Sequence, residues 1–230
     1  MSTLSDQLQS IIDASGATSV GLALHHLESG EQILLNADES FPMCSVLKIP
    51  VLVEAFRQMA EGKFSLADRW PLTQAEKNIG SGILTYLENG LQPTVGDLLT
   101  LMIIISDNTA TDMVINRLGV ERINQTMHEL GLADIHMALS IRGIFDDMLG
   151  VEGADPVRLF IDLDKAKSAP PTRRDGRAFS NGPDNNVSTA RDMTRLVAMI
   201  FRGEVVDRSA CDAMLHILLQ QQLNGRLPLF

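Results

Sequence analysis

Residues 94–110 read Thr-Val-Gly-Asp-Leu-Leu-Thr-Leu-Met-Ile-Ile-Ile-Ser-Asp-Asn-Thr-Ala. Thr94 and Asp97 have the spacing of a capping box, which predicts that a helix starts here. The run from Leu98 to Ile105 is apolar almost without a break, so we expect this helix to be buried on all sides. It is too short to span a bilayer. Because the run ends on Ser106-Asp107-Asn108, it carries polar groups into the interior, where they need partners or have a function.

A second motif lies earlier in the chain, where residues 45–48 read Ser-Val-Leu-Lys. On a helix, positions i and i+3 share a face, so the Ser45 hydroxyl is expected beside the Lys48 amine. A serine hydroxyl needs a nearby base to become a nucleophile, and a lysine acts as that base only when it is uncharged. Apolar residues flank the motif on both sides, which favours a lowered lysine pKa over the alternative of a solvated helix start.

In this order and combination, Ser45–Lys48 and Ser106–Asn108 resemble the signature of the penicillin-recognising serine hydrolases, the class A beta-lactamase-like superfamily. The resemblance implies that Ser45 is the nucleophile, Lys48 the general base and Ser106 a proton relay to the leaving group. It also implies that Asn108 contacts a substrate amide. The alternative for Asn108 is that it only caps the next helix, Thr109–Leu118. The resemblance implies neither a metal nor an organic cofactor.

The third motif of that family, Lys-Thr-Gly on a strand, does not follow before Phe230. In the family this strand supplies a lysine for the substrate carboxylate and a backbone N–H for the oxyanion hole. We therefore expect a chain truncated before this strand, with little turnover, that is part of a longer protein or has its sheet completed by a second chain.

The family's lactam-hydrolysing members also carry a glutamate that activates water, followed by an asparagine, and Ile141–Asn186 contains no Glu-x-x-x-Asn. Three other carboxylates are substitute candidates for this base: Asp146, Asp147 and Glu152. Within the same stretch, Asp155-Pro156 predicts the start of an amphipathic helix. The composition of Ala169–Gly182 predicts a loop.

The presence or absence of a water-activating base separates four hypotheses. The chain is a serine hydrolase that acts through an acyl-enzyme on a beta-lactam or a related amide or ester. Alternatively, it is a penicillin-binding or DD-peptidase-like protein that is acylated but deacylates slowly. A third possibility is a cytoplasmic esterase with the same Ser-Lys pair, and a fourth is an inactive interaction module with the same fold.

The expected fold class is α+β, a helix-and-sheet sandwich of the serine beta-lactamase and DD-peptidase type that is mostly helical in this chain. Residues 1–230 are expected to form a single, incomplete domain. Within it, 50–188 are a mainly helical subdomain, and 1–45 and 189–230 belong to the sheet-bearing subdomain. The C-terminal strands of the sheet are expected to be missing.

The expected elements are a helix at Leu4–Ala14 and a β-hairpin formed by Ser19–Leu27 and Gln32–Leu35. Pro50–Leu130 is expected to be helical throughout, with stops at Gly62, Gly90, Gly119 and Gly131. Two further helices are expected at Thr189–Arg202 and Asp207–Leu223.

The composition of the chain limits the classes of partner and of site that we expect. A net charge of −10 without basic patches argues against nucleic-acid binding. Two cysteines that lie far apart indicate neither a disulfide framework nor a zinc site. No secretory signal or membrane segment is visible at the N-terminus, so a cytoplasmic location follows if the start is native, and a periplasmic or secreted one if it is trimmed. The expected partner is a small-molecule acyl substrate.

Overall fold

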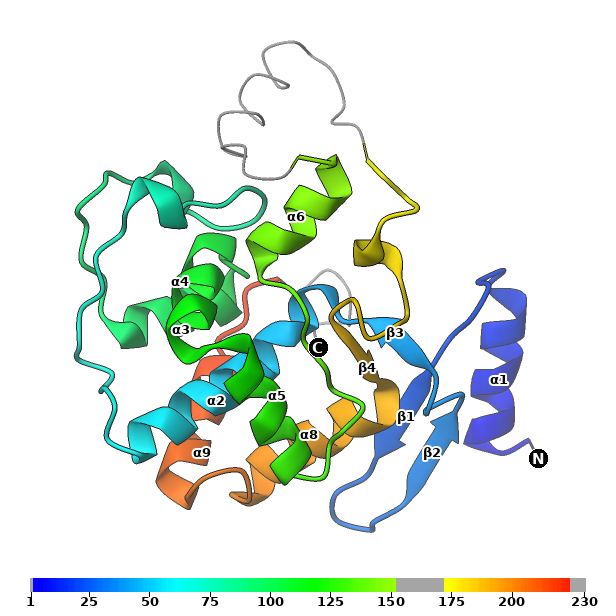
Figure 1. The fold of residues 1–230 in the computed structure, drawn as a ribbon. Coiled ribbons are helices and arrows are strands. Elements are labelled where there is room, and N and C mark those ends of the chain that lie inside the picture. Colours follow the sequence, from blue (N-terminus) through cyan, green and yellow to red (C-terminus); the bar gives the residue numbers. More distant parts are fainter. Residues whose placement is uncertain (1, 152–171, 224–230) are drawn as a thin grey trace.

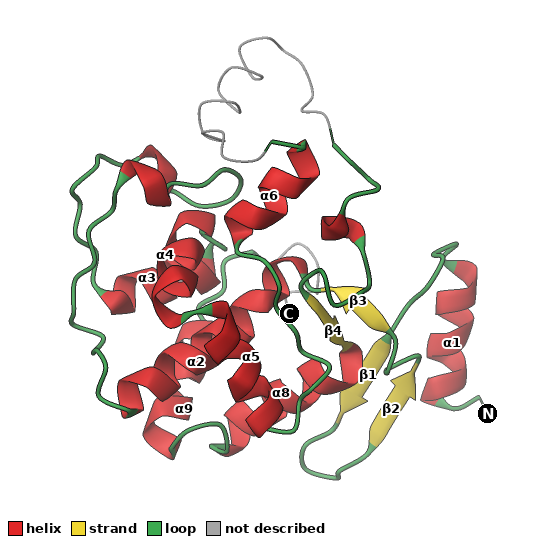
Figure 2. Cartoon of the chain, in the orientation of Figure 1, coloured by secondary structure: helices red, strands yellow, loops and turns green. Residues whose placement is uncertain are grey.

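The computed structural model describes residues 2–151 and 172–223 of the chain. Figures 1 and 2 show a largely helical part on the left and the strands on the right, with helices beside them. The predicted α+β fold, mostly helical with an N-terminal β-hairpin, is confirmed.

The helical part is built around α2 (Lys48–Ala60), which contacts four other helices. Those helices are α3 (Val95–Ile104), α4 (Asn108–Leu118), α5 (Val120–Glu129) and α9 (Arg208–Leu218). Helix α6 (Ile141–Leu149) packs on α4. Leu47, Leu52, Leu98 and Met113 are fully buried at the centre of this cluster. The position of α2 in the core keeps its first residue, Lys48, away from bulk water.

The strands form two antiparallel pairs in the described part of the chain. The hairpin joins β1 (Leu22–His25) to β2 (Gln32–Leu35), with α8 (Ala190–Arg202) packed against β1 and α1 (Leu4–Ala14) lying outside the hairpin (Figure 1). The second pair joins β3 (Ser40–Pro42) to β4 (Val187–Thr189). The Met43 N–H continues this pairing by donating to the Asn186 carbonyl at 2.8 Å, which fixes the chain just before Ser45.

The boundaries of several elements agree with the sequence-based expectations. Helix α1 and strand β2 have the expected bounds. The Thr94–Asp97 capping box is present, because the Thr94 hydroxyl accepts the Asp97 N–H and the Asp97 carboxylate accepts the Thr94 N–H. The Thr189 side chain caps α8 by accepting the Asp192 N–H.

The expectation of helix throughout Pro50–Leu130 is wrong for residues 61–94. These residues contain two short 3-10 turns, η2 (Gln74–Glu76) and η3 (Leu84–Tyr86), and are otherwise loop. Gly62, Gly80, Gly82 and Gly90 all have positive φ in this segment, a conformation that ends helices. Helix α9 also ends at Leu218, earlier than expected. The expected helix at Asp155-Pro156 lies outside the described residues.

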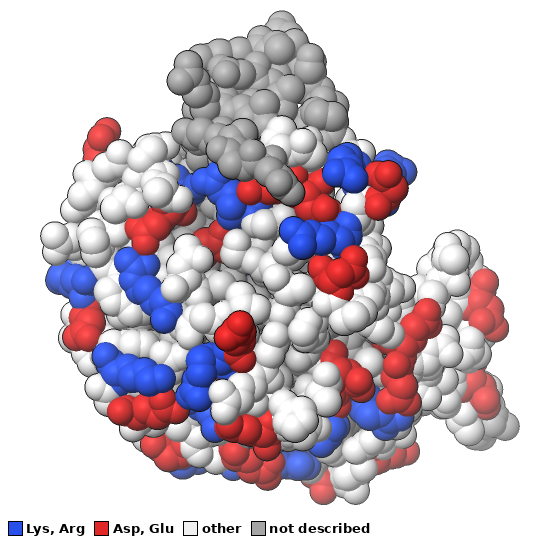
Figure 3. Space-filling view, viewed as in Figure 1, with Lys and Arg blue, Asp and Glu red and all other residues white. Residues whose placement is uncertain are grey.

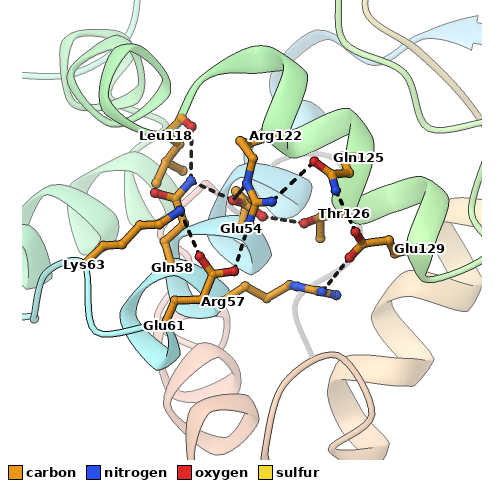
Figure 4. A network of polar contacts seen from close by, with 10 residues as sticks. All are labelled: Glu54, Arg57, Gln58, Glu61, Lys63, Leu118, Arg122, Gln125, Thr126 and Glu129. Atoms are coloured by element: carbon orange, nitrogen blue, oxygen red, sulfur yellow. Dashed lines mark hydrogen bonds and ion pairs between the residues drawn. The ribbon is translucent and has the colours of Figure 1, made fainter.

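A network of polar side chains ties α2 to α5 (Figure 4). At its centre is Glu54, which is fully buried and accepts the Thr126 hydroxyl at 2.5 Å and the Gln58 amide at 2.6 Å. Arg122 lies 3.5 Å from the same carboxylate and 2.8 Å from Glu61. Because a buried carboxylate is costly unless it is paired, this network fixes how α2 is placed against α5.

The outer surface is acidic overall but mixed in detail. On the face shown in Figure 3, Lys and Arg side chains are scattered among Asp and Glu. None of the helices in the described ranges is long and apolar enough to cross a membrane.

Candidate active site

Ser45 and Lys48 are held together by the local backbone. Ser45 lies in η1 (Cys44–Leu47), a single 3-10 turn that leads directly into α2 at Lys48. A 3-10 helix has three residues per turn, so side chains at i and i+3 are eclipsed. The Lys48 Nζ accordingly lies 3.4 Å from the Ser45 Oγ. Ser45 is exposed at the surface, whereas Lys48 is 2% exposed.

Ser106 completes a triangle with these two residues. Its hydroxyl lies 2.7 Å from the Lys48 Nζ and 3.0 Å from the Ser45 Oγ. The Ser106 backbone has a φ of +59° at the junction between α3 and α4, a conformation that is rare outside glycine and recurs at active sites. The fold thus brings Lys48 and Ser106, which are 58 positions apart in the sequence, within hydrogen-bonding distance of each other.

Lys48 makes two further contacts behind this triangle. Its Nζ lies 2.8 Å from the Ser106 carbonyl oxygen and 3.0 Å from the Asn108 Oδ1. Burial lowers the pKa of Lys48 from 10.5 to about 8, against the opposing effect of the Asp107 and Asp112 carboxylates. A fraction of the amines is therefore uncharged near neutral pH, as a general base requires.

Asn108 is buried and its side-chain amide is bound within the protein. The Nδ2 donates to the Ile79 carbonyl at 2.9 Å, and the Oδ1 lies near both Lys48 and the Ser81 hydroxyl. The cap of α4 is the neighbouring Asp107, whose carboxylate accepts the Ala110 N–H, so the alternative in which Asn108 caps this helix is wrong. A substrate contact for Asn108 stays a prediction.

Asp107 also connects the site to a glycine-containing segment of the loop. Its Oδ2 accepts the backbone N–H groups of Ile83 and Leu84, at 2.7 and 3.0 Å. Gly82 lies against this carboxylate with a φ of +112°, so a Cβ there would collide with Asp107. The loop and the start of α4 are thereby joined through one side chain.

Sequence reasoning missed three residues of this site: Ser81, Asp107 and Asp112. The Ser81 hydroxyl donates to the Ser106 carbonyl at 2.7 Å, which supports the unusual backbone there. Asp107 had a usable signal, since Asp before a helix is a common cap. Ser81 had only its position between two glycines, which predicts a turn but no contact.

Asp112 is a buried carboxylate that anchors the start of α6. Its oxygens accept the backbone N–H groups of Ile141 and Arg142, both at 2.7 Å, and the Asn78 amide at 2.8 Å. Burial raises its pKa from 3.8 to about 6, although these hydrogen bonds oppose the shift.

The Ser45 hydroxyl opens into a cleft of about 500 Å³. Its lining combines the three catalytic candidates with mostly apolar side chains from η1, α2, α3 and the end of α9: Met43, Cys44, Ser45, Val46, Lys48, Ile49, Ser81, Met102, Ile103, Ser106, Leu218, Gln221 and Leu223. Among the described residues, no group of His, Cys, Asp or Glu side chains is arranged to hold a metal ion.

Of the three substitute bases, the two in the described part of the chain, Asp146 and Asp147, do not lie in this lining. The Asp147 carboxylate accepts the Ala178 N–H at 2.9 Å and lies 3.6 Å from Arg177, so it holds the 177–179 turn. Asp146 is on the same helix and also has an interaction partner. Glu152 lies outside the described residues.

Comparisons with known proteins agree with the geometry. Residues 3–230 match a family model described as the beta-lactamase enzyme family. Beta-lactamase OXY-2 of Klebsiella oxytoca is 28% identical over 120 residues, covering 51% of this chain and 41% of that protein. Beta-lactamase Toho-1 of Escherichia coli is 30% identical over 117 residues, covering 51% and 40%. The matched regions thus span about two fifths of these relatives.

Solved structures extend the likeness to almost the whole chain. A beta-lactamase from Sphaerobacter thermophilus superposes with a TM-score of 0.74 at 28% identity, covering 96% of this chain and 71% of that one. PBP-A superposes with a TM-score of 0.75 at 25% identity, covering 96% and 69%. A mutant of PBP-A has been solved as an acyl-enzyme complex with penicillin G.

Proposed function

This chain belongs to the beta-lactamase enzyme family and has the class A fold, and on that premise we propose that it is a serine hydrolase that forms an acyl-enzyme on Ser45. The substrate is a beta-lactam or a related amide or ester. The proposal is carried by one observation, the triangle of the Ser45 Oγ, the Lys48 Nζ and the Ser106 Oγ.

The proposed reaction gives each member of the triangle a role. The Ser45 Oγ forms a bond to the acyl carbon while uncharged Lys48 takes the serine proton, directly over 3.4 Å or through the Ser106 hydroxyl. Ser106 then passes its proton to the leaving nitrogen or oxygen as the bond from the acyl carbon breaks, and the Lys48 ammonium returns the serine proton to the Ser106 oxygen over 2.7 Å. Water later cleaves the ester on Ser45 and releases the acid.

A slow second step is favoured by the lining of the cleft. Among the described residues that form it, none carries a carboxylate that would activate water. This observation supports the second candidate, a penicillin-binding protein in which the acyl-enzyme persists.

Incubation with a fluorescent penicillin, followed by intact mass measurement over time, tests both candidates. A labelled Ser45 that loses the adduct promptly supports a hydrolase, and a lasting adduct supports the binding protein. The variant Ser45→Ala should not be labelled. Because Cys44 is exposed beside Ser45, the matched control Cys44→Ala should be labelled like the unchanged protein.

Two other outcomes count against a beta-lactam substrate. Turnover of simple esters without a penicillin adduct indicates an esterase. Absence of both adduct and ester turnover in a folded protein rejects the proposed acyl-enzyme and leaves the inactive module.

A further inference from the structure

The described residues that line the cleft in front of Ser45 fall into two chemically different groups. The first, polar group lies at the catalytic triangle, together with Ser81. The second group, called here the apolar part of the cleft, consists of Val46 and Ile49, of Met102 and Ile103 from the end of α3, and of Leu218 and Leu223 from the end of α9 and the residues after it. Three separate parts of the fold thus contribute hydrocarbon to one space.

The wall formed by residues 218–223 is fixed in place by hydrogen bonds to α3. The Gln222 N–H donates to the Ile104 carbonyl at 2.9 Å, and the Gln221 Nε2 donates to the Ile103 carbonyl at 2.7 Å. The Gln221 Oε1 accepts the Leu223 N–H at 2.7 Å. Both ends of the Gln221 amide are therefore bound within the protein.

The charged group in the cleft is also committed to protein contacts. Lys48 is the one ionisable amine or guanidinium among the described lining residues, and its Nζ contacts two oxygens of Ser106 as well as Ser45 and Asn108. Among the described residues of the apolar part, none offers a charged partner to a charged substituent, which would lose its water there, and that loss is costly. An apolar substituent would gain the free energy of leaving water.

We propose that the apolar part of this cleft binds an uncharged, apolar acyl group of the substrate, such as a straight alkyl chain or an aryl group. This inference rests on the proposed function, because it places the acyl carbon at Ser45. A volume of about 500 Å³ is within the range of small-molecule sites, about 300 to 1,000 Å³. With an ester of this kind, Ser45 takes the acyl group, the ester C–O bond breaks, and the alcohol leaves with the serine proton.

A series of para-nitrophenyl esters tests the inference. From acetate to butyrate to hexanoate, kcat/KM should rise about threefold to fourfold for each methylene added. The monoester of adipic acid has the same length as the hexanoate but ends in a carboxylate, and its kcat/KM should be about tenfold lower than that of the hexanoate.

Two leucines offer a matched pair of variants. Leu223 lines the cleft and is 57% exposed, whereas Leu219 is 84% exposed and does not line it. Leu223→Ser should lower kcat/KM for the hexanoate about fivefold and leave the acetate nearly unchanged. Leu219→Ser should behave like the unchanged protein with both esters.

The result that overturns the inference is a kcat/KM that stays flat or falls with chain length, or that favours the adipate monoester. Failure of the proposed function appears differently, as the absence of any Ser45-dependent acylation. In that case, titration calorimetry of Ser45→Ala with the same esters tests whether the cleft still binds an apolar acyl group. Tighter binding of the hexanoate than of the acetate supports an apolar acyl site, and equal binding rejects it.

Discussion

The hydroxyl oxygens of Ser106 and Ser45 lie 3.0 Å apart, closer than the Lys48 nitrogen is to Ser45, although the two serines are sixty-one positions apart in the sequence. Ser106 in turn lies 2.7 Å from Lys48. The route from the proposed nucleophile Ser45 to the proposed base Lys48 through the Ser106 hydroxyl therefore consists of two hydrogen bonds, each shorter than the direct 3.4 Å contact.

Removal of that hydroxyl should slow acylation strongly. For Ser106→Ala we expect the rate of Ser45 acylation by a fluorescent penicillin to fall about 100-fold to 10,000-fold, the usual contribution of a positioned proton-transfer group. Thermal unfolding should show a folded protein. A rate within a factor of about two of the unchanged protein would mean that Lys48 takes the proton directly.

The pH dependence of acylation follows from the lowered pKa of Lys48. Because the amine must be uncharged, the acylation rate should rise about tenfold per pH unit and level off above about pH 8. Stopped-flow labelling across pH 6 to 9 measures this profile. Lys48→Arg, which stays charged, should abolish the rise, whereas Cys44→Ala should keep it.

The same pKa shift has a consequence for stability, with a defined sign. The pKa of Lys48 is lower in the folded than in the unfolded chain, so between about pH 8 and 10.5 the unfolded chain binds more protons. The free energy of unfolding attributable to Lys48 should therefore rise with pH across this window. Urea titrations of the unchanged protein and Lys48→Met check this, and a difference between the two that does not change with pH contradicts it.

The contact between Gly82 and Asp107 can be separated from the cost of backbone conformation. Gly82 and Gly62 both have positive φ, but a Cβ at Gly62 meets no atom within 4 Å, whereas one at Gly82 collides with the Asp107 carboxylate. Gly62→Ala should cost about 1 kcal/mol of unfolding free energy. Gly82→Ala should cost about 1 to 3 kcal/mol more and should also slow acylation. If chemical denaturation shows equal losses of unfolding free energy for the two variants, the loop around Gly82 moves to accommodate the Cβ.

Both carboxylate oxygens of the buried Glu54 accept hydrogen bonds, so replacing one of these oxygens should destabilise the protein. Two side-chain donors, from Thr126 and Gln58, meet its two oxygens, and a glutamine offers only one oxygen. We expect Glu54→Gln to lower the free energy of unfolding by about 1 to 3 kcal/mol. The exposed Glu88 provides the control, since Glu88→Gln should change it by less than about 0.5 kcal/mol. Similar values for the two variants would contradict the role given to this network.

The sequence was informative where local rules decide. The capping box at Thr94 predicted the start of α3, and the i, i+3 spacing predicted that Ser45 and Lys48 would lie together. Family membership and fold class are confirmed by the comparisons. The start of α3 and the pairing of Ser45 with Lys48 each depend on residues only three positions apart, so local sequence is enough to predict them.

Features that depend on long-range packing were not predicted. Residues 61–94 were expected to be helical between the stops at Gly62 and Gly90, but the structure shows mostly loop there. The contact that holds this loop, from the Ile83 N–H to Asp107, joins residues far apart in the sequence. The contact of Ser81 with Ser106 joins two loops through a single hydroxyl. No periodicity in the sequence encodes such a contact, and it becomes visible only when both segments are placed around α4.

Helix α2 has a buried amine at its start, held by Ser106 in the junction between α3 and α4, and a buried carboxylate at Glu54, held by Thr126 of α5. A shift of the helix along its axis by one residue would take both groups away from their partners at once. Because unpaired buried charges are costly, we expect α2 to resist sliding along its axis. We therefore expect Ser45 and Lys48 to keep fixed positions, so that differences in rate among substrates reflect how well each substrate fits the cleft.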